Sequence, residues 1–204
     1  SEIVGMCPPD FMVNVTLNGD KDISGFYLGD YIEAHKVGRA AAKETAMQAV
    51  EKAFPVVVTS NSGFPLDQNL YQTVKGISAA ARIVSDGGHI LVASECSDGV
   101  PNHGNFAEIM REGKTPSDVL ASIRALDKPI LDQWQAQILA GILERAKIRV
   151  LSEIDQSEIE ACKLETIDDL NVGVRDSLAV SNEARVAVLP DGPLTIPYIG
   201  EPHE

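Results

Sequence analysis

The sequence predicts an α/β fold: a single domain with a mostly parallel sheet flanked by helices and an antiparallel hairpin at the N-terminus. Two observations carry this prediction. Apolar residues alternate with polar ones on both sides of the turn-rich segment 18–20, as is typical of two hairpin strands. From residue 56 onward, strand-like and helix-like stretches follow one another, which indicates βαβ units and a largely parallel sheet.

Composition agrees with a globular protein of this class. The chain has 204 residues, of which 44% are hydrophobic, so it can bury a core of its own. Thirty acidic and 17 basic side chains give a formal net charge of −13. This charge repels phosphate backbones and anionic lipids, and no local basic patch offsets it. We therefore expect no nucleic-acid partner and no membrane partner.

The sequence also suggests where the protein works. Its longest apolar runs fall far short of the roughly 18 residues that a membrane-spanning helix needs. The first ten residues lack the basic and long apolar regions of a secretory signal. Three cysteines without a CxxC pair fit a reducing compartment. The predicted location is the cytoplasm.

The N-terminal elements follow from local patterns. Segments 12–17 and 23–28 alternate in polarity and are predicted to be the two hairpin strands. A helix is predicted from Asp30 to Lys52, because Asp30 can cap its first turn and an apolar stripe follows at helical spacing. The pair Phe54-Pro55 is expected to end this helix.

The remaining elements alternate along the chain. Short apolar, β-branched runs predict strands, and longer runs with helical spacing predict helices. The predicted strands are 56–60, 89–93, 148–151 and 185–189, and the predicted helices are 69–84, 106–111, 116–126, 132–146, 157–163 and 177–184. A proline-rich tail follows the last strand.

Several common functional motifs are absent from the sequence. Gly113-Lys114-Thr115 resembles the end of a phosphate-binding loop, but Glu108 stands where that loop needs glycine. No GxGxxG follows a strand, and neither GxSxG nor HExxH occurs. Cys96, Asp98 and His103 lie close together in sequence, yet such loop residues more often satisfy turns than hold a metal. We expect no metal site in this chain.

Ligands of open α/β sheets collect at the carboxyl ends of the strands. Here the loops 59–67 and 94–104 occupy those positions, and both are small, polar and glycine-containing. Asp67 is expected to cap the helix that follows the first loop. The N-terminus of that helix would suit an anion.

One turn of that helix carries an unusual group of side chains. Tyr71, Gln72 and Lys75 are three or four residues apart, which places a phenol, an amide and an ammonium on one side. Such a set can hold a small carboxylate that carries a neighbouring oxygen. On spacing alone, Tyr71 packing in the core and solvated Gln72 and Lys75 remain an open alternative. Trp134, the only tryptophan, is either a packing residue or a ligand wall.

Sequence similarity adds to this interpretation. The segment 60–72, SNSGFPLDQNLYQ, followed by Lys75, resembles the signature of the nickel-pincer lactate racemase family, specifically of its C-terminal domain. The resemblance continues through 95–99 (ECSDG), 132–135 (DQWQ) and 188–193 (VLPDGP), and it covers most of the chain.

The resemblance implies a larger protein. Members of the family are about twice this length and bind their ligands between two α/β domains. Residues 1–204 then form the C-terminal domain, with residues 1–10 as a candidate interdomain connection. The missing N-terminal domain would be the partner. It would bind the nickel-pincer nucleotide and supply the histidines that ligate nickel and act as acid and base. No such cofactor is expected in this fragment.

The resemblance also assigns roles. It makes Lys75 the catalytic residue and Gln72, Tyr71 and Trp134 substrate-binding residues of a nickel-dependent 2-hydroxyacid racemase or epimerase. In that family the pincer accepts hydride from carbon 2 of the substrate and returns it to the other face. We expect the isolated fragment to be inactive.

Two alternative functions, from other functional classes, stay open. The first is a non-catalytic module that binds a small carboxylate or phosphate at the helix N-terminus near Asp67. The second is a hydrolase in which Cys96 and His103 act together.

Overall fold

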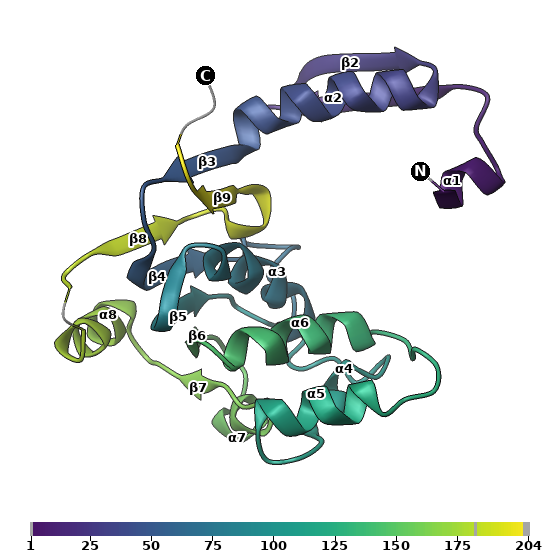
Figure 1. The fold of residues 1–204 in the computed structure, drawn as a ribbon. Coiled ribbons are helices and arrows are strands. Elements are labelled where there is room, and N and C mark those ends of the chain that lie inside the picture. The colour runs from purple at the N-terminus through teal and green to yellow at the C-terminus, as the bar shows by residue number, and fades with distance from the viewer. Residues whose placement is uncertain (1, 182, 202–204) are drawn as a thin grey trace. The chain divides into compact units, whose positions relative to one another are not determined.

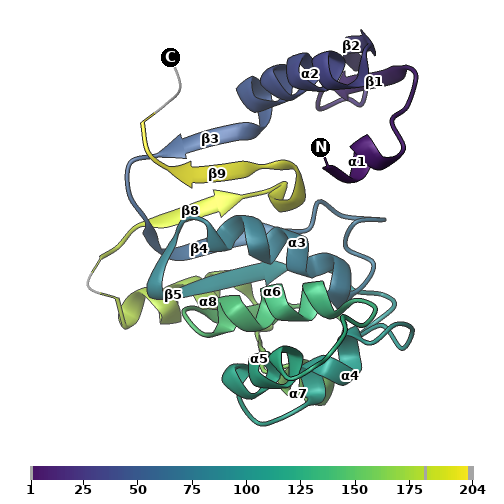
Figure 2. The ribbon, with the colours of Figure 1, turned by 45° about the vertical axis from the view of Figure 1, so that its right-hand side comes forward.

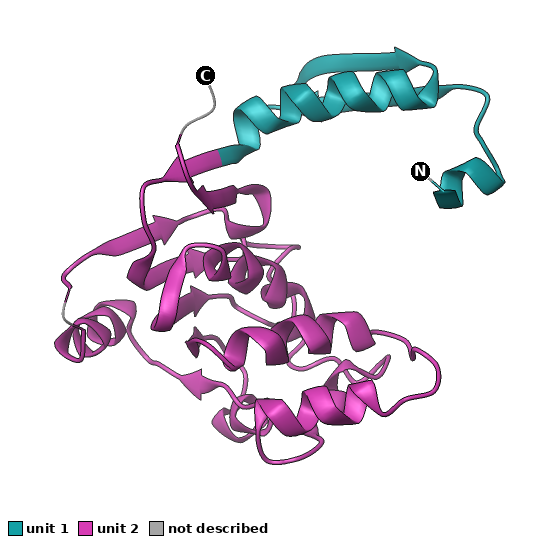
Figure 3. Ribbon diagram, in the orientation of Figure 1, with its two compact units in different colours: residues 1–47 teal, residues 48–204 magenta. Residues whose placement is uncertain are grey.

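The structure is a computed structural model that describes residues 2–181 and 183–201. Contacts divide the chain into two compact units, residues 1–47 (unit 1) and 48–204 (unit 2), as Figure 3 shows. The sequence pattern predicts one domain, 1–204. The predicted class is confirmed: unit 1 contains the antiparallel hairpin, and unit 2 contains a parallel sheet flanked by helices.

Unit 1 is a hairpin with one long helix. The turn between the strands is closed by Asn18, whose Oδ1 accepts hydrogen bonds from the backbone N–H groups of Asp20 and Asp22. Asp30 caps the long helix as predicted, because its carboxylate accepts from the backbone N–H groups of two residues in the first turn. The elements are α1 (Glu2–Met6), β1 (Met12–Leu17), β2 (Ile23–Gly29) and α2 (Tyr31–Ala46).

The helix predicted from Asp30 to Lys52 is too long, because α2 ends at Ala46. The chain continues as β3 (Met47–Val50), which pairs with β9 (Ile196–Ile199) in a separate two-stranded sheet. β9 comes from the proline-rich tail, in which the sequence predicted no strand. Pairing between segments so far apart overrides the local helical pattern.

Unit 2 is built on a five-stranded sheet in the order β7-β6-β5-β4-β8 (Figures 1 and 2). All four neighbouring pairs are parallel. The strands are β4 (Phe54–Ser60), β5 (Val84–Ala93), β6 (Lys147–Leu151), β7 (Glu165–Thr166) and β8 (Val186–Leu189). The four predicted strands 56–60, 89–93, 148–151 and 185–189 are confirmed, whereas the two-residue β7 gave no recognisable pattern.

Helices cover both faces of this sheet. Figure 2 shows α3 in front of the strands and α8 behind them, and α3 also contacts α6. The core between these layers is mainly apolar, and Leu70, Ile77, Ile90, Phe106 and Leu139 are completely buried in it. The helices are α3 (Leu70–Ala81), α4 (Phe106–Arg111), α5 (Pro116–Arg124), α6 (Gln133–Leu143), α7 (Gln156–Ala161) and α8 (Leu170–Ala179), and a short 3-10 helix, η1, spans Gly192–Leu194. Within the described residues, no helix is long and apolar enough to cross a membrane.

Two local predictions for unit 2 are wrong. The cap of α3 is Asn69 and not Asp67, because the Asn69 side chain accepts from the backbone N–H of Gln72. The helix predicted at 177–184 begins earlier, as α8, because Asp169 caps it at the backbone N–H of Val172. Residue 182 of that predicted helix lies outside the described residues.

Gly76 permits α3 to approach the end of β4 closely. A Cβ atom at Gly76 would lie 2.7 Å from the Ser60 carbonyl oxygen and 3.0 Å from Asn61 Oδ1. Gly76→Ala should therefore lower the free energy of unfolding by about 1–3 kcal/mol through overpacking. Gly141 in α6 is the matched control, because a Cβ there meets nothing within 4 Å.

Gly141→Ala should instead stabilise the fold by about 0.5–1 kcal/mol, since alanine is the better helix former. Chemical denaturation of both variants measures the difference. Equal effects at the two glycines would mean that the contact between α3 and β4 is not close.

Candidate functional site

The candidate site lies at the carboxyl edge of the parallel sheet. The chain runs from β4 through β5 and β6 to β7 on one side, and then returns to β8 on the other side of β4. The reversal makes the ends of β4 and β8 a topological switch point, where open α/β sheets bind ligands. Asn61, which follows β4, and Asp191, which follows β8, form an isolated antiparallel bridge there.

Asn61 fixes the loop between β4 and α3. Its side chain is completely buried, and its Oδ1 accepts a hydrogen bond of 3.0 Å from the backbone N–H of Gly76. Its Nδ2 donates to the carbonyl oxygen of Leu66. A buried amide that is satisfied on both sides holds the loop and the helix in one arrangement. Sequence reasoning did not single out this residue.

The two predicted loops hold each other at the start of α3. Backbone N–H groups of Cys96 and Asp98 donate to the carbonyl oxygens of Asp67 and Gln68, both at 2.9 Å. The backbone N–H of Leu70 donates to the carbonyl oxygen of Gly99. Cys96 takes a positive φ of 56°, a conformation that non-glycine residues seldom adopt. The first turn of α3 is therefore placed by both loops.

Lys75 and Gln72 lie together on that part of α3, as their spacing predicted. Lys75 Nζ donates a 2.5 Å hydrogen bond to Gln72 Oε1. Lys75 is exposed and Gln72 is half-buried, so neither is directed into the packed interior. Because Gln72 Oε1 holds the ammonium, the amide hydrogens on Gln72 Nε2 are the part of this side chain that can donate to a ligand.

Tyr71 turns toward α4 and α6. Its ring makes edge contacts with Phe106, at a centroid distance of 5.5 Å, and with Trp134, at 6.0 Å. The Gln135 side chain, almost completely buried, donates from Nε2 to the Tyr71 carbonyl oxygen at 2.8 Å. Trp134 itself is 54% exposed, so its ring is available as a wall. Tyr71 therefore packs, as one of the two readings left open by spacing expects, and its ring lies beside the exposed ring of Trp134.

Asp132 is a residue of this region that sequence reasoning did not assign. It precedes α6 with a positive φ of 63°, and its carboxylate makes no helix-capping bond. A Cβ at Gly104 would collide with this carboxylate, so Gly104 provides the space that it occupies. Burial is the largest cause that raises the pKa of Tyr71, and the charge and hydrogen bonding of Asp132 raise it further. The signal in the sequence was its place in the segment 132–135 (DQWQ), which also contains Trp134.

Asp132→Asn should lower the pKa of Tyr71, although not fully to about 10, because burial remains. A raised pKa means that the native state favours the neutral phenol. This contribution to stability is complete below the ordinary tyrosine pKa and is lost as the pH rises through the folded-state value. Tyrosinate absorbance during an alkaline titration measures the shift, with Tyr71→Phe to identify the signal. An unchanged titration in Asp132→Asn would remove Asp132 from the surroundings of the phenol.

The surroundings of Cys96 oppose the hydrolase reading. Cys96 is almost completely buried, and its Sγ lies 3.3 Å from the hydroxyl oxygens of both Ser94 and Thr73. Burial is the main cause that raises the pKa of this thiol, which disfavours the reactive thiolate. His103 is exposed on the following loop. In the part of the chain that the structure describes, no three His, Cys, Asp or Glu side chains are grouped to hold a metal ion.

The helix N-terminus near Asp67 is a poor anion site. The backbone N–H of Leu70 already donates to Gly99, and that of Gln72 donates to the Asn69 side chain. Asp67 is itself buried there, and Asp98 accepts a hydrogen bond from Gln68 Nε2. Two carboxylates beside largely satisfied N–H groups oppose phosphate binding.

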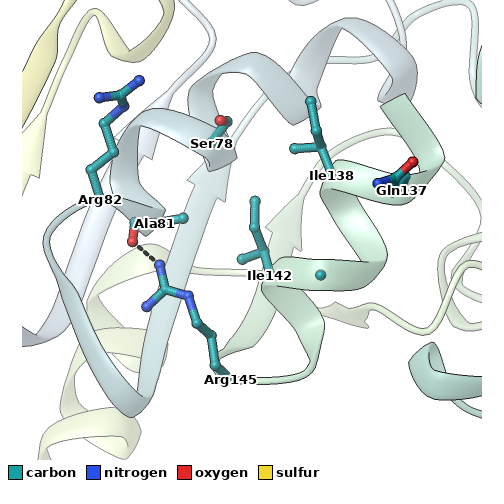
Figure 4. Close-up of a pocket in the computed structure, with 8 residues that line it drawn as sticks. Ser78, Ala81, Arg82, Gln137, Ile138, Ile142 and Arg145 are labelled. Atoms are coloured by element: carbon teal, nitrogen blue, oxygen red, sulfur yellow. Dashed lines mark hydrogen bonds between the residues drawn. The ribbon is translucent and has the colours of Figure 1, made fainter. Parts of the chain in front are cut away.

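A cavity of about 410 Å³ lies elsewhere, at the C-terminal ends of α3 and α6 (Figure 4). Arg145 at its edge donates to the carbonyl oxygens of Ala81 and Val84. Ala81 is the last residue of α3 and Val84 the first of β5, so this guanidinium is explained by capping the helix end and fixing the turn into the strand. None of the four predicted site residues lines this cavity.

Comparison with known proteins agrees with the fold. Residues 49–196 match the family model of the lactate racemase C-terminal domain. The chain is 36% identical to a lactate racemase of Thermoanaerobacterium thermosaccharolyticum over 186 residues, and 34% identical to one of Lactiplantibacillus plantarum over 189 residues. Each match covers 89% of this chain but 43% of the relative. The chain thus spans less than half the length of these proteins.

Comparison with solved structures also finds a lactate racemase. The lactate racemase apoprotein from Thermoanaerobacterium thermosaccharolyticum superposes with a TM-score of 0.88 at 32% identity, over 95% of this chain and 47% of that one. A Thermotoga maritima protein shares the fold alone, with a TM-score of 0.64 at 10% identity, over 93% of this chain and 49% of that one. With a family model that covers most of its length, the chain belongs to the lactate racemase C-terminal domain family.

Proposed function

We propose that this chain is the C-terminal, substrate-contacting part of a 2-hydroxyacid racemase or epimerase of the lactate type. The observation that carries the proposal is the hydrogen bond between the exposed Lys75 and the half-buried Gln72, on the first turns of α3 at the carboxyl edge of the sheet. The family match supports the reaction class, since the relatives are named lactate racemases. The activity belongs to the whole polypeptide.

Lys75 and Gln72 would bind the oxygens of the substrate. A 2-hydroxyacid carries a carboxylate next to a hydroxyl group, and the hydroxyl becomes a carbonyl when carbon 2 is oxidised. Lys75 Nζ supplies a positive charge for these oxygens, and Gln72 Nε2 supplies a neutral donor. Donors placed in advance beside a developing negative charge stabilise the transition state more than the ground state.

Tyr71 and Trp134 would form the adjoining wall. Their edge contact, together with the contact between Tyr71 and Phe106, holds the phenol in one orientation. The half-exposed indole can cover the apolar part of a small acid and exclude water from it. In this proposal Tyr71 presents its hydroxyl at the boundary of the site, and a hydrogen bond with the Asp132 carboxylate orients that hydroxyl.

The nickel-pincer nucleotide would be bound mainly by the N-terminal part of the protein. The side chains gathered here are an amine, an amide, a phenol and an indole, which suit an organic acid rather than a nickel ion. When bound, the nucleotide would supply reversible acceptance of hydride from carbon 2. We place the protein in the cytoplasm; its three free cysteines support this.

The test is racemisation of a panel of 2-hydroxyacids with different side chains. The polypeptide that includes the N-terminal part, matured with its nickel cofactor, should interconvert the enantiomers of at least one acid. The 204-residue chain alone should leave all of them unchanged. The proposal would be contradicted if the short chain alone racemised any of the acids. It would also be contradicted if the matured polypeptide racemised none of them.

A further inference from the structure

One face of the hairpin in unit 1 is apolar and exposed. In the β1–β2 register, Val13 lies opposite Leu28 and Val15 lies opposite Phe26, so these four side chains share a face. Leu17 and Ile23 extend the row at the turn. The exposed fractions range from 37% for Val15 to 68% for Val13. We call these six residues the hairpin face: Val13, Val15, Leu17, Ile23, Phe26 and Leu28.

The other side of the hairpin is already covered. There Tyr27 lies against α2, because a Cβ at Gly38 would meet the Tyr27 ring at 3.1 Å. Tyr27 is half-buried, in contrast with its exposed neighbours Phe26 and Leu28. Unit 1 therefore has one sheet face packed on a helix, as Figure 2 shows for α2 and the two strands, while the side chains of the other face are exposed.

Unit 1 buries very little of its apolar surface. Ala34 is the single buried side chain among residues 2–47. A two-stranded hairpin with one helix and almost no buried core falls below what an independent fold needs. An open face of six apolar side chains is larger than the scattered exposure of ordinary surfaces, and it resembles half of a sheet core.

We propose that the hairpin face packs against the polypeptide that precedes residue 1 in the parent protein, and completes a core with it. This rests on the proposed function, in which the chain is the C-terminal part of a longer racemase. The relatives have more than half of their length outside the matched region. The superposition on the solved racemase covers 95% of this chain and so omits only about ten residues. Because the hairpin and α2 contain more residues than that, the superposition includes at least part of unit 1.

Physical arguments favour this occupant over a second copy of the chain. A segment joined covalently to the hairpin is present at an effective concentration in the millimolar range, above that of separate copies. The hairpin face also carries no charged side chain that would give a dimer its register. The covering segment should accordingly present apolar side chains.

Photo-crosslinking of the whole parent polypeptide tests the proposal. A photoreactive phenylalanine analogue replaces Phe26 on the hairpin face, and in a control it replaces Asn14, which lies opposite Tyr27 and so belongs to the other face. We expect the probe at position 26 to link to peptides upstream of residue 1 within the same chain, and the probe at 14 to give at least tenfold less of this product. Links to a second copy, links only to residues 48–204, or no link at position 26 would overturn the proposal.

A stability measurement serves as the second readout. Val13→Ser should lower the thermal midpoint of the parent polypeptide by several degrees, but should leave that of the 204-residue chain nearly unchanged, because the face is uncovered there. Val180→Ser, at a position that is 75% exposed in unit 2, is the control and should change neither. Equal effects of Val13→Ser in both proteins would contradict the proposal. Both readouts are independent of turnover, so a racemase assay that fails does not decide them.

Discussion

Lys75→Ala is expected to reduce kcat/KM for the 2-hydroxyacid by about 100- to 1000-fold in the matured parent polypeptide, the loss typical of removing one donor from a developing oxyanion. Lys75 Nζ is the cation of the Lys75–Gln72 pair, and it would bind oxygens whose charge grows as carbon 2 is oxidised. Most of the loss should appear in kcat, with a smaller rise in KM for the carboxylate. Initial rates of racemisation, measured by chiral chromatography, give both constants.

The control for Lys75 is Lys147, an exposed lysine at the start of β6 and so at the opposite edge of the sheet. Lys147→Ala removes the same charge from the molecule without touching the candidate site, and should change kcat/KM less than twofold. Unchanged turnover in Lys75→Ala, or equal losses in the two variants, would remove Lys75 from the mechanism.

Phe106→Ala should lower the free energy of unfolding by about 3–5 kcal/mol, as is usual for truncating a completely buried phenylalanine. Phe106 is 0% exposed in the core of unit 2, and its ring meets the edge of Tyr71. The cavity left behind would also loosen the phenol. Equilibrium denaturation by urea measures the first effect.

Phe64 provides the matched control, since it is 76% exposed in the loop after β4. Phe64→Ala should change the free energy of unfolding by less than about 0.5 kcal/mol. A loss at Phe106 no larger than the loss at Phe64 would show that the described core is wrong around α4.

Much of the fold could be predicted from local patterns. The turn at Asn18 and the cap at Asp30 act within a few residues, and the alternation after residue 55 reports on burial. β3 and β9 could not be predicted, because each becomes a strand only by pairing with a segment about 150 residues away. Whether Asp67 or Asn69 caps α3 depends on the loop 94–104, because backbone N–H groups of that loop donate hydrogen bonds to the carbonyl oxygens of Asp67 and Gln68.

The candidate site likewise has one part that the sequence predicts and another that it does not. The contact between Lys75 and Gln72 follows from helical spacing, because residues three apart share a face. The orientation of Tyr71 does not, since it is set by Phe106 and Trp134 from distant segments. Cys96 lies in a polar loop, but the chain turns its side chain inward to Thr73 and Ser94. Neighbouring positions in sequence do not reveal such burial.

A crystal structure of the parent polypeptide with a bound 2-hydroxyacid, or with the corresponding 2-oxo acid, tests the central claim most directly. The account predicts that Lys75 Nζ and Gln72 Nε2 lie within about 2.7–3.2 Å of ligand oxygens, with the Trp134 ring against the rest of the ligand. A ligand bound at another edge of the sheet, with Lys75 and Gln72 still facing solvent, would contradict it.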